Sequence, residues 1–113
     1  MKYLMLVCVD PDVPDEEIPG APDTEQWVKD NDAKGVRLMG SRVRPGSDAT
    51  TVRVRDGQTL VTDGPFADTK EIFAGFYLIE ADDLDQATEL AARIPAVRIG
   101  GSVEIRPVVI ERG

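Results

Sequence analysis

Histidine is absent from the 113 residues, and cysteine occurs once. Without imidazole the chain has no Ser-His-Asp or Cys-His catalytic group and lacks the usual ligands of a zinc site. The single Cys8 lies in an apolar stretch, where a thiol stays protonated, and one cysteine builds no disulfide framework. Acid–base chemistry is therefore left to carboxylates, lysine or tyrosine, and we expect no metal or other cofactor.

The chain also lacks long apolar runs and an excess of base. No run approaches the ~20 residues of a membrane span, and no small-residue cleavage site follows the apolar opening Lys2–Val9. Acidic residues number 21 against 13 basic ones, a net charge of −8. Such a balance disfavours direct binding to nucleic acid or to an anionic membrane. We expect a cytoplasmic protein.

Residues 1–113 are expected to form a single domain, because this length suits one hydrophobic core. Apolar and β-branched patterns predict six strands, at 2–9, 36–43, 51–55, 59–62, 72–80 and 102–109. Two helices are predicted, one at 24–34 and one that starts near Asp82 and stops at Pro95. Without the two middle strands the order is βαββαβ, so the fold class is α+β, ferredoxin-like with an inserted β-hairpin.

Helix signals come from the residues at the ends of each segment. Asp23 with Gln26 forms a capping-box pattern, Gly35 supplies a stop, and Trp27 is the expected apolar anchor of the first helix. Three aspartates at the start of the second helix suit its dipole, and their spacing matches no calcium loop: Asp82, Asp83 and Asp85. Leu84, Ala87, Ala91 and Ile94 form its apolar face.

The inserted hairpin is signalled by Asp56-Gly57, a pair typical of a type I′ turn. Thr51, Arg53 and Arg55 are expected on its polar, solvated face. The hairpin is thus expected to be half exposed.

Two strands, Lys2–Val9 and Ile72–Glu80, are apolar on both alternating faces. Two helices cover only one side of a sheet, and the other side would leave a large apolar patch in water. Self-association of the open faces removes that patch, so the sequence predicts a homodimer. Gly75, inside the second of these strands, suggests a bulge or a close backbone approach.

The chain must turn sharply at Asp63-Gly64-Pro65-Phe66. Pro65 fixes its own φ and pushes Gly64 out of the α region. Asp63 can accept hydrogen bonds from following amides, and Asp68 with Glu71 resembles a capping box. A second irregular stretch, Asp10–Pro22, has four prolines and five acids; it is either a solvated connector or a lid.

The segment VRVRDGQTLVTDGPFADTKEIFAGFYLIEADDLDQATELAARIP, with SVEIRPV near the end, resembles the DGPF branch of the YCII-related domain family, whose members read DGPFAETKE here. The resemblance implies a dimeric α+β barrel of unknown biochemical role, often encoded near extracytoplasmic-function sigma factors. Some wider relatives are thought to be enzymes that use a His-Asp pair, and one is a dehydrochlorinase. Because this chain has no histidine, only the segment Asp63–Glu71 is carried over, as a pocket rim.

Two functions follow as hypotheses. The favoured one is a homodimeric small-molecule-binding or accessory protein linked to sigma-factor regulation. The alternative is a histidine-free proton-transfer or lyase-type enzyme with Asp63 or Glu71 as base and Lys70 as electrostatic stabiliser. In both, the expected pocket-rim residues are Asp63, Gly64, Pro65, Phe66, Thr69, Lys70 and Tyr77.

Overall fold

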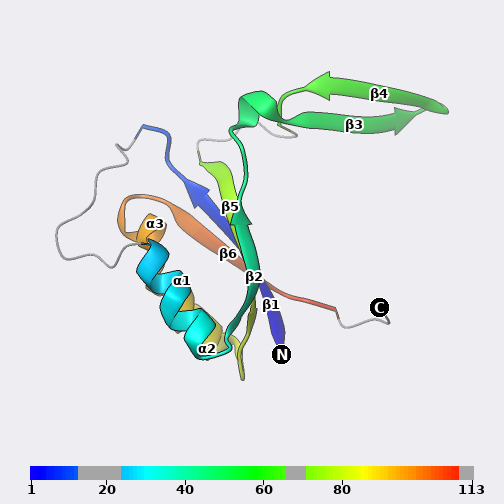
Figure 1. The fold of residues 1–113 in the computed structure, drawn as a ribbon. Helices are drawn as coiled ribbons and strands as arrows, with labels where there is room; N and C mark the ends of the chain where they lie inside the picture. The colour runs from blue at the N-terminus through cyan, green and yellow to red at the C-terminus, as the bar shows by residue number, and fades with distance from the viewer. Residues whose placement is uncertain (13–23, 66–70, 110–113) are drawn as a thin grey trace.

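The computed structural model describes residues 1–12, 24–65 and 71–109. Within these ranges the chain is an α+β domain with antiparallel sheets (Figure 1). Its elements, in chain order, are β1 (Lys2–Val9), α1 (Thr24–Ala33), β2 (Arg37–Arg42), the single 3-10 turn η1 (Gly46–Asp48), β3 (Thr50–Arg55), β4 (Gln58–Asp63), β5 (Ile72–Glu80), α2 (Leu84–Ala92), α3 (Pro95–Arg98) and β6 (Ser102–Pro107).

The main sheet has four strands in the order β2-β5-β1-β6, and every neighbouring pair is antiparallel. Both central strands, β1 and β5, are the two whose sequences are apolar on both faces. With two helix-bearing crossovers between its strands, this sheet is consistent with a ferredoxin-like α+β fold.

The helices lie on one face of the main sheet, and the core is between them (Figure 1). Tyr3, Met5 and Val7 of β1 point to that side and are buried. Trp27 of α1 is 4% exposed, and its indole nitrogen donates a 3.1 Å hydrogen bond to the Leu90 carbonyl. The tryptophan therefore connects α1 to α2, and the prediction that it is the apolar anchor of the first helix is confirmed.

Helix α1 ends in a left-handed glycine. Gly35 has φ +70°, and its amide donates to the Asp32 carbonyl, while the Val36 amide donates to the Asn31 carbonyl. This pair of bonds is a Schellman motif, so the predicted glycine stop is confirmed. The proposed N-cap Asp23 lies outside the described residues.

Helix α2 begins with Asp83 as N-cap, whose carboxylate accepts a 2.9 Å bond from the Gln86 amide. The prediction that an aspartate opens this helix is confirmed. The helix ends at Ala92, two residues before the predicted end, and Pro95 begins the short helix α3 because proline fits the first helical position. Leu84 was expected on the apolar face but is 53% exposed. It is the first residue of the helix.

Between β1 and β5 the register shifts by one residue, at Val7 and Cys8. Val7 pairs with Gly75 and Cys8 with Phe73, so Ala74 is the extra residue of a β-bulge. A Cβ at Gly75 would lie 2.8 Å from the Ser41 carbonyl oxygen. Both roles suggested for this glycine, a bulge and a close backbone approach, are confirmed.

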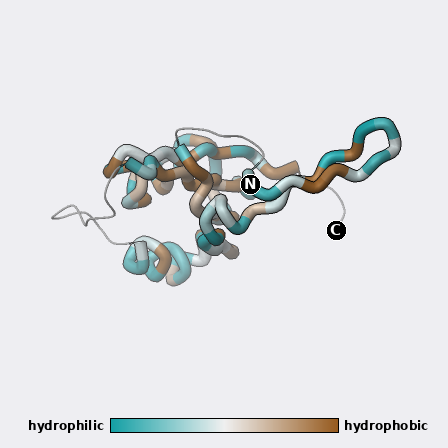
Figure 2. Tube along the Cα trace, turned by 90° about the horizontal axis from the view of Figure 1, so that it is seen from above, coloured by the Kyte–Doolittle hydropathy of each residue, from teal (hydrophilic) through white to brown (hydrophobic). Residues whose placement is uncertain are grey.

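Strands β3 and β4 form a separate two-stranded sheet that extends away from the main sheet (Figures 1 and 2). Asp56 and Gly57 have φ of 52° and 77°, as a type I′ turn requires. Arg55 is exposed, as expected for the polar face, but the opposite, apolar face is exposed as well. Val52 and Val54 are 60% and 67% exposed, whereas Arg53 is only partly exposed. The hairpin leaves the body of the domain instead of lying on it, so nothing in the described chain covers the valines.

Candidate functional site

The face of the main sheet opposite the helices is apolar at its centre. Leu4 pairs with Leu78 and Leu6 with Phe76, and these four side chains are partly exposed. Met39 extends the Leu4–Leu78 row on β2 and is 52% exposed. We call this surface the open face, defined by Leu4, Leu6, Met39, Phe76 and Leu78. No described element covers it.

One end of the open face carries polar groups. Cys8 lies beside Phe73 on β5 and Ser102 on β6. The Ser102 hydroxyl donates a 2.6 Å hydrogen bond to Oε2 of Glu71, which is partly buried just before β5. We call Cys8, Glu71 and Ser102 the polar end of the open face. It joins a carboxylate and a hydroxyl to an apolar surface, an arrangement that can orient a mostly apolar molecule.

The thiol at the polar end is a poor nucleophile. Burial raises the pKa of Cys8, and the carboxylates of Glu71 and Glu104 raise it further. Glu104 lies on the same side as Leu6 and holds Arg106 at 2.7 Å. The thiol therefore stays protonated at neutral pH, as the sequence indicated, and contributes shape more than reactivity.

The predicted turn lies at the base of the hairpin. Gly64 has φ +107°, and its amide donates a 2.8 Å bond to the Ala49 carbonyl. Its own carbonyl accepts a 2.8 Å bond from the Thr51 hydroxyl. Asp63 pairs with Thr50 across the hairpin, and its side chain is exposed, as is Pro65. These contacts fix the direction in which the hairpin leaves the domain.

Three residues of the predicted rim, Phe66, Thr69 and Lys70, lie outside the described residues, as do Asp68 and most of the stretch Asp10–Pro22. The candidate base Glu71 is brought to the polar end of the open face, whereas the rim residues Asp63, Gly64 and Pro65 stay with the hairpin. The sequence did not identify Ser102 as a site residue. Only the pairing of β6 with β1 places this serine beside Cys8.

Tyr77 lies on the helix side of the sheet. Its ring centroid is 4.6 Å from that of Trp27, and the Arg37 guanidinium is 5.7 Å above the ring. Burial raises the pKa of Tyr77, and the charges of Arg37 and Arg42 offset part of that rise. The sheet thus separates Tyr77 from the polar end of the open face.

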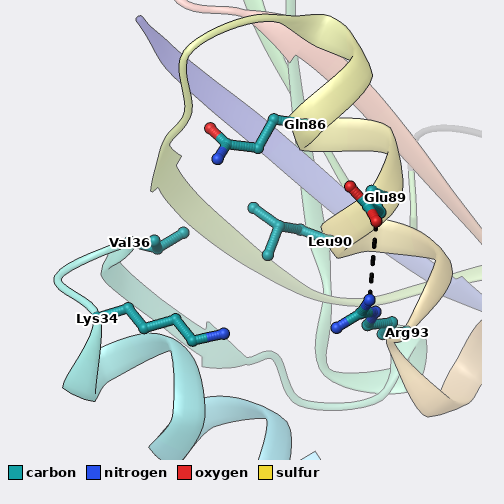
Figure 3. Close-up of a pocket in the computed structure, with 6 residues that line it drawn as sticks. All are labelled: Lys34, Val36, Gln86, Glu89, Leu90 and Arg93. Atoms are coloured by element: carbon teal, nitrogen blue, oxygen red, sulfur yellow. Dashed lines mark ion pairs between the residues drawn. The ribbon is translucent and has the colours of Figure 1, made fainter.

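A shallow groove lies between the start of β2 and α2, with a volume of about 190 Å³. Figure 3 shows its lining: Lys34, Val36, Gln86, Glu89, Leu90 and Arg93. Glu89 and Arg93 form an ion pair of 3.7 Å along α2. Its volume is below the roughly 300 Å³ at which ordinary ligand pockets begin. The groove contains none of the predicted site residues and is a weaker candidate than the open face.

Among the described ranges, no three His, Cys, Asp or Glu side chains gather closely enough to hold a metal ion. No helix in the same ranges is long and apolar enough to cross a membrane.

Fold and surface together define an antiparallel α+β domain with helices on one side and an apolar, partly exposed sheet face on the other. The family model of the YCII-related domain matches residues 1–111, and the chain belongs to that family. It is similar to an uncharacterised protein of Rhizobium meliloti (strain 1021), with 34% identity over 103 residues, covering 77% of this chain and 83% of that protein.

Proposed function

We propose that the chain is a homodimeric binding protein. The two copies pack through their open faces, and a small, largely apolar molecule with an amine or hydroxyl group binds at the polar end. The observation that carries this proposal is the partly buried Glu71 carboxylate, bonded to Ser102 at the end of an apolar face. A carboxylate has room for about four hydrogen bonds, so Glu71 can hold Ser102 and accept another from a ligand.

The dimer is supported by the shape of one chain. Its radius of gyration is 16.1 Å, whereas a compact chain of this length has about 13 Å. Its shortest extent is 20 Å, the thickness of one helix layer on one sheet. Packing a second sheet on the open face supplies the layer that a single chain lacks. Static light scattering at micromolar concentration should give twice the chain mass, and a monomer mass would refute the dimer.

Binding is tested by titrating phenethylamine and 2-phenylethanol into the ¹⁵N-labelled protein. Both probes should shift the amide signals of Cys8, Phe76 and Ser102. A hydrogen bond to a charged group contributes about 1.5–3 kcal/mol, so Glu71→Gln should weaken binding of the amine by about tenfold or more. Glu104→Gln is the matched control, since it removes the same charge from another position of the same face. Millimolar probe that shifts no signal at the polar end would contradict the proposal.

The alternative, a proton-transfer or lyase-type enzyme, has less support from the described residues. A general base gains its strength from a desolvated, specific environment. Asp63 is exposed at the base of the hairpin, and Lys70 lies outside the described residues. Glu71 has the more enclosed position, but one of its oxygens already accepts a hydrogen bond from the Ser102 hydroxyl, and its neighbour Cys8 is protonated. These contacts suit recognition of a bound group.

An accessory role in sigma-factor regulation is the finer form of this proposal. It is supported by the net charge of −8, which favours a basic protein surface over nucleic acid as a partner. Sedimentation velocity of the dimer mixed with a purified sigma factor of the same organism tests it. An unchanged sedimentation coefficient at micromolar concentrations would refute this form and leave small-molecule binding in place.

A further inference from the structure

The hairpin of β3 and β4, residues 50–63, carries an apolar face that no other described residue covers. We call the hairpin the arm, and we call Val52, Val54 and Val61 its valine face. Val52 and Val61 are cross-strand partners, and Val54 follows on the same side. Their exposed fractions are 60%, 64% and 67% for Val52, Val61 and Val54. The opposite face has Thr51 and Arg53, which are less exposed.

The arm is held in a fixed direction at its base. The Gly64 amide bonds to the Ala49 carbonyl, and the Thr51 hydroxyl bonds to the Gly64 carbonyl. Pro65 packs near Gly46, where an added Cβ would lie 3.7 Å from the proline ring. An isolated two-stranded hairpin is marginally stable in water. The hairpin has a fixed direction at its base and an exposed apolar face further out. Burial of that face against another protein surface would stabilise it.

We propose that the arm lies on a second copy of this chain and buries its valine face there. This inference rests on the proposed dimer and extends its interface from the open face to the arm. Because the two copies are related by symmetry, each arm then contacts the other copy in the same way.

The exposed area of one chain is large enough for such an interface. The whole chain exposes 8268 Å², whereas a compact monomer of 12.3 kDa exposes about 6,100 Å². The excess is about 2,200 Å², and a standard stable interface buries about 800 Å² on each partner. The area of one chain is therefore no obstacle to an interface that includes both the open face and the arm.

Charge also favours a second copy as the occupant. The chain has a net charge of −8, so two copies repel each other over most of their surfaces. The arm has two basic residues, Arg53 and Arg55, and two acidic ones, Asp56 and Asp63, which gives it no net charge. It is therefore a segment of an acidic chain that can approach another copy without repulsion.

The first test is the double variant Val52→Thr/Val54→Thr, which keeps β-branched side chains of similar size and replaces one methyl group of each with a hydroxyl. Both positions are exposed in a single chain, so folding should be unaffected. The dimer dissociation constant, from sedimentation equilibrium, should rise about tenfold or more. Leu60→Thr is the control, because Leu60 is an exposed apolar residue of the same hairpin on its opposite face. A double variant that dimerises as tightly as the wild type would overturn the proposal.

The second test is photo-cross-linking from a benzophenone side chain placed at Val54, in a mixture of ¹⁵N-labelled and unlabelled chains. Contact with a second copy should give cross-linked pairs of one labelled and one unlabelled peptide. Pairs from within a single chain alone, or no pairs, would refute the arm contact.

The double variant Met39→Ser/Phe73→Ser separates this inference from the proposed dimer. Met39 belongs to the open face, Phe73 lies at its polar end, and both side chains are about half exposed. If it dissociates the dimer while the arm variant does not, the dimer stands and the arm contact fails. A wild-type chain that is monomeric at micromolar concentration refutes both.

Discussion

Gly40→Ala should destabilise the domain, because the backbone of β2 passes directly over Tyr77. A Cβ at Gly40 would lie 2.5 Å from the ring carbon Cδ1 of Tyr77 and 2.6 Å from the Phe76 carbonyl oxygen. The ring is packed against Trp27, and the oxygen is backbone, so neither neighbour moves easily. Overpacking of this kind costs about 1–3 kcal/mol, and the stiffer unfolded chain of an alanine variant offsets about 0.4–1 kcal/mol. The free energy of unfolding should fall by about 1–2 kcal/mol.

Urea unfolding followed by Trp27 fluorescence measures this change, since Trp27 is the single tryptophan and is buried in the core. Protein concentration must be equal in all samples, because dimerisation would stabilise the folded chain. Gly46→Ala is the matched control. A Cβ at Gly46 meets only the Pro65 ring, at an ordinary 3.7 Å, so its stability should change by less than about 0.5 kcal/mol. Equal unfolding free energies for the two variants would refute the packing argument.

Three further outcomes are expected. Gly64→Ala should also lower stability, by about 1 kcal/mol, because its φ of +107° strains an alanine although no atom lies within 4 Å of the new Cβ; unchanged urea unfolding would contradict this. Asp83→Ala should cost about 1 kcal/mol by removing the cap on the Gln86 amide, and an unaltered melting temperature would show that the cap is dispensable. The raised pKa of Cys8 should displace its alkylation by iodoacetamide to higher pH than a free thiol, since only the thiolate reacts. Glu71→Gln removes a negative charge that raises this pKa and should move the profile back down; an identical pH profile would refute that coupling.

Local signals predicted most of the fold because each acts over a few residues. Gly35 ends α1, Asp83 caps α2, and Asp56-Gly57 forms the tight turn of the hairpin. The two strands with apolar residues on both faces, β1 and β5, are the central strands of the main sheet. These features depend on backbone conformation and hydrophobic periodicity, which a sequence carries directly.

The position of the hairpin could not be predicted in this way. Alternating valines and arginines along β3 indicate two different faces, and a covered apolar face is the usual outcome. Which face is covered depends on where the hairpin points. That direction is set by the bonds of Gly64 to Ala49 and Thr51, residues 13 to 15 positions away in the chain. The valines are consequently exposed.

The polar end of the open face depends on a single residue in the register of the sheet. With regular pairing beyond Val7 and Gly75, Cys8 would lie opposite Ala74, and Phe73 would fall one position further along β1. The bulge makes Ala74 the extra residue and sets Phe73 opposite Cys8. Compared with regular pairing, every β5 residue that precedes Ala74 lies one position closer to Cys8. Its side chain is also on the opposite face of the sheet, because faces alternate along a strand. Glu71 precedes Phe73 by two residues, so the same shift brings its carboxylate to the Ser102 hydroxyl on β6. Gly75 indicated a bulge, but the identity of the extra residue follows only from the pairing of β5 with β1, so the site became visible only in the folded chain.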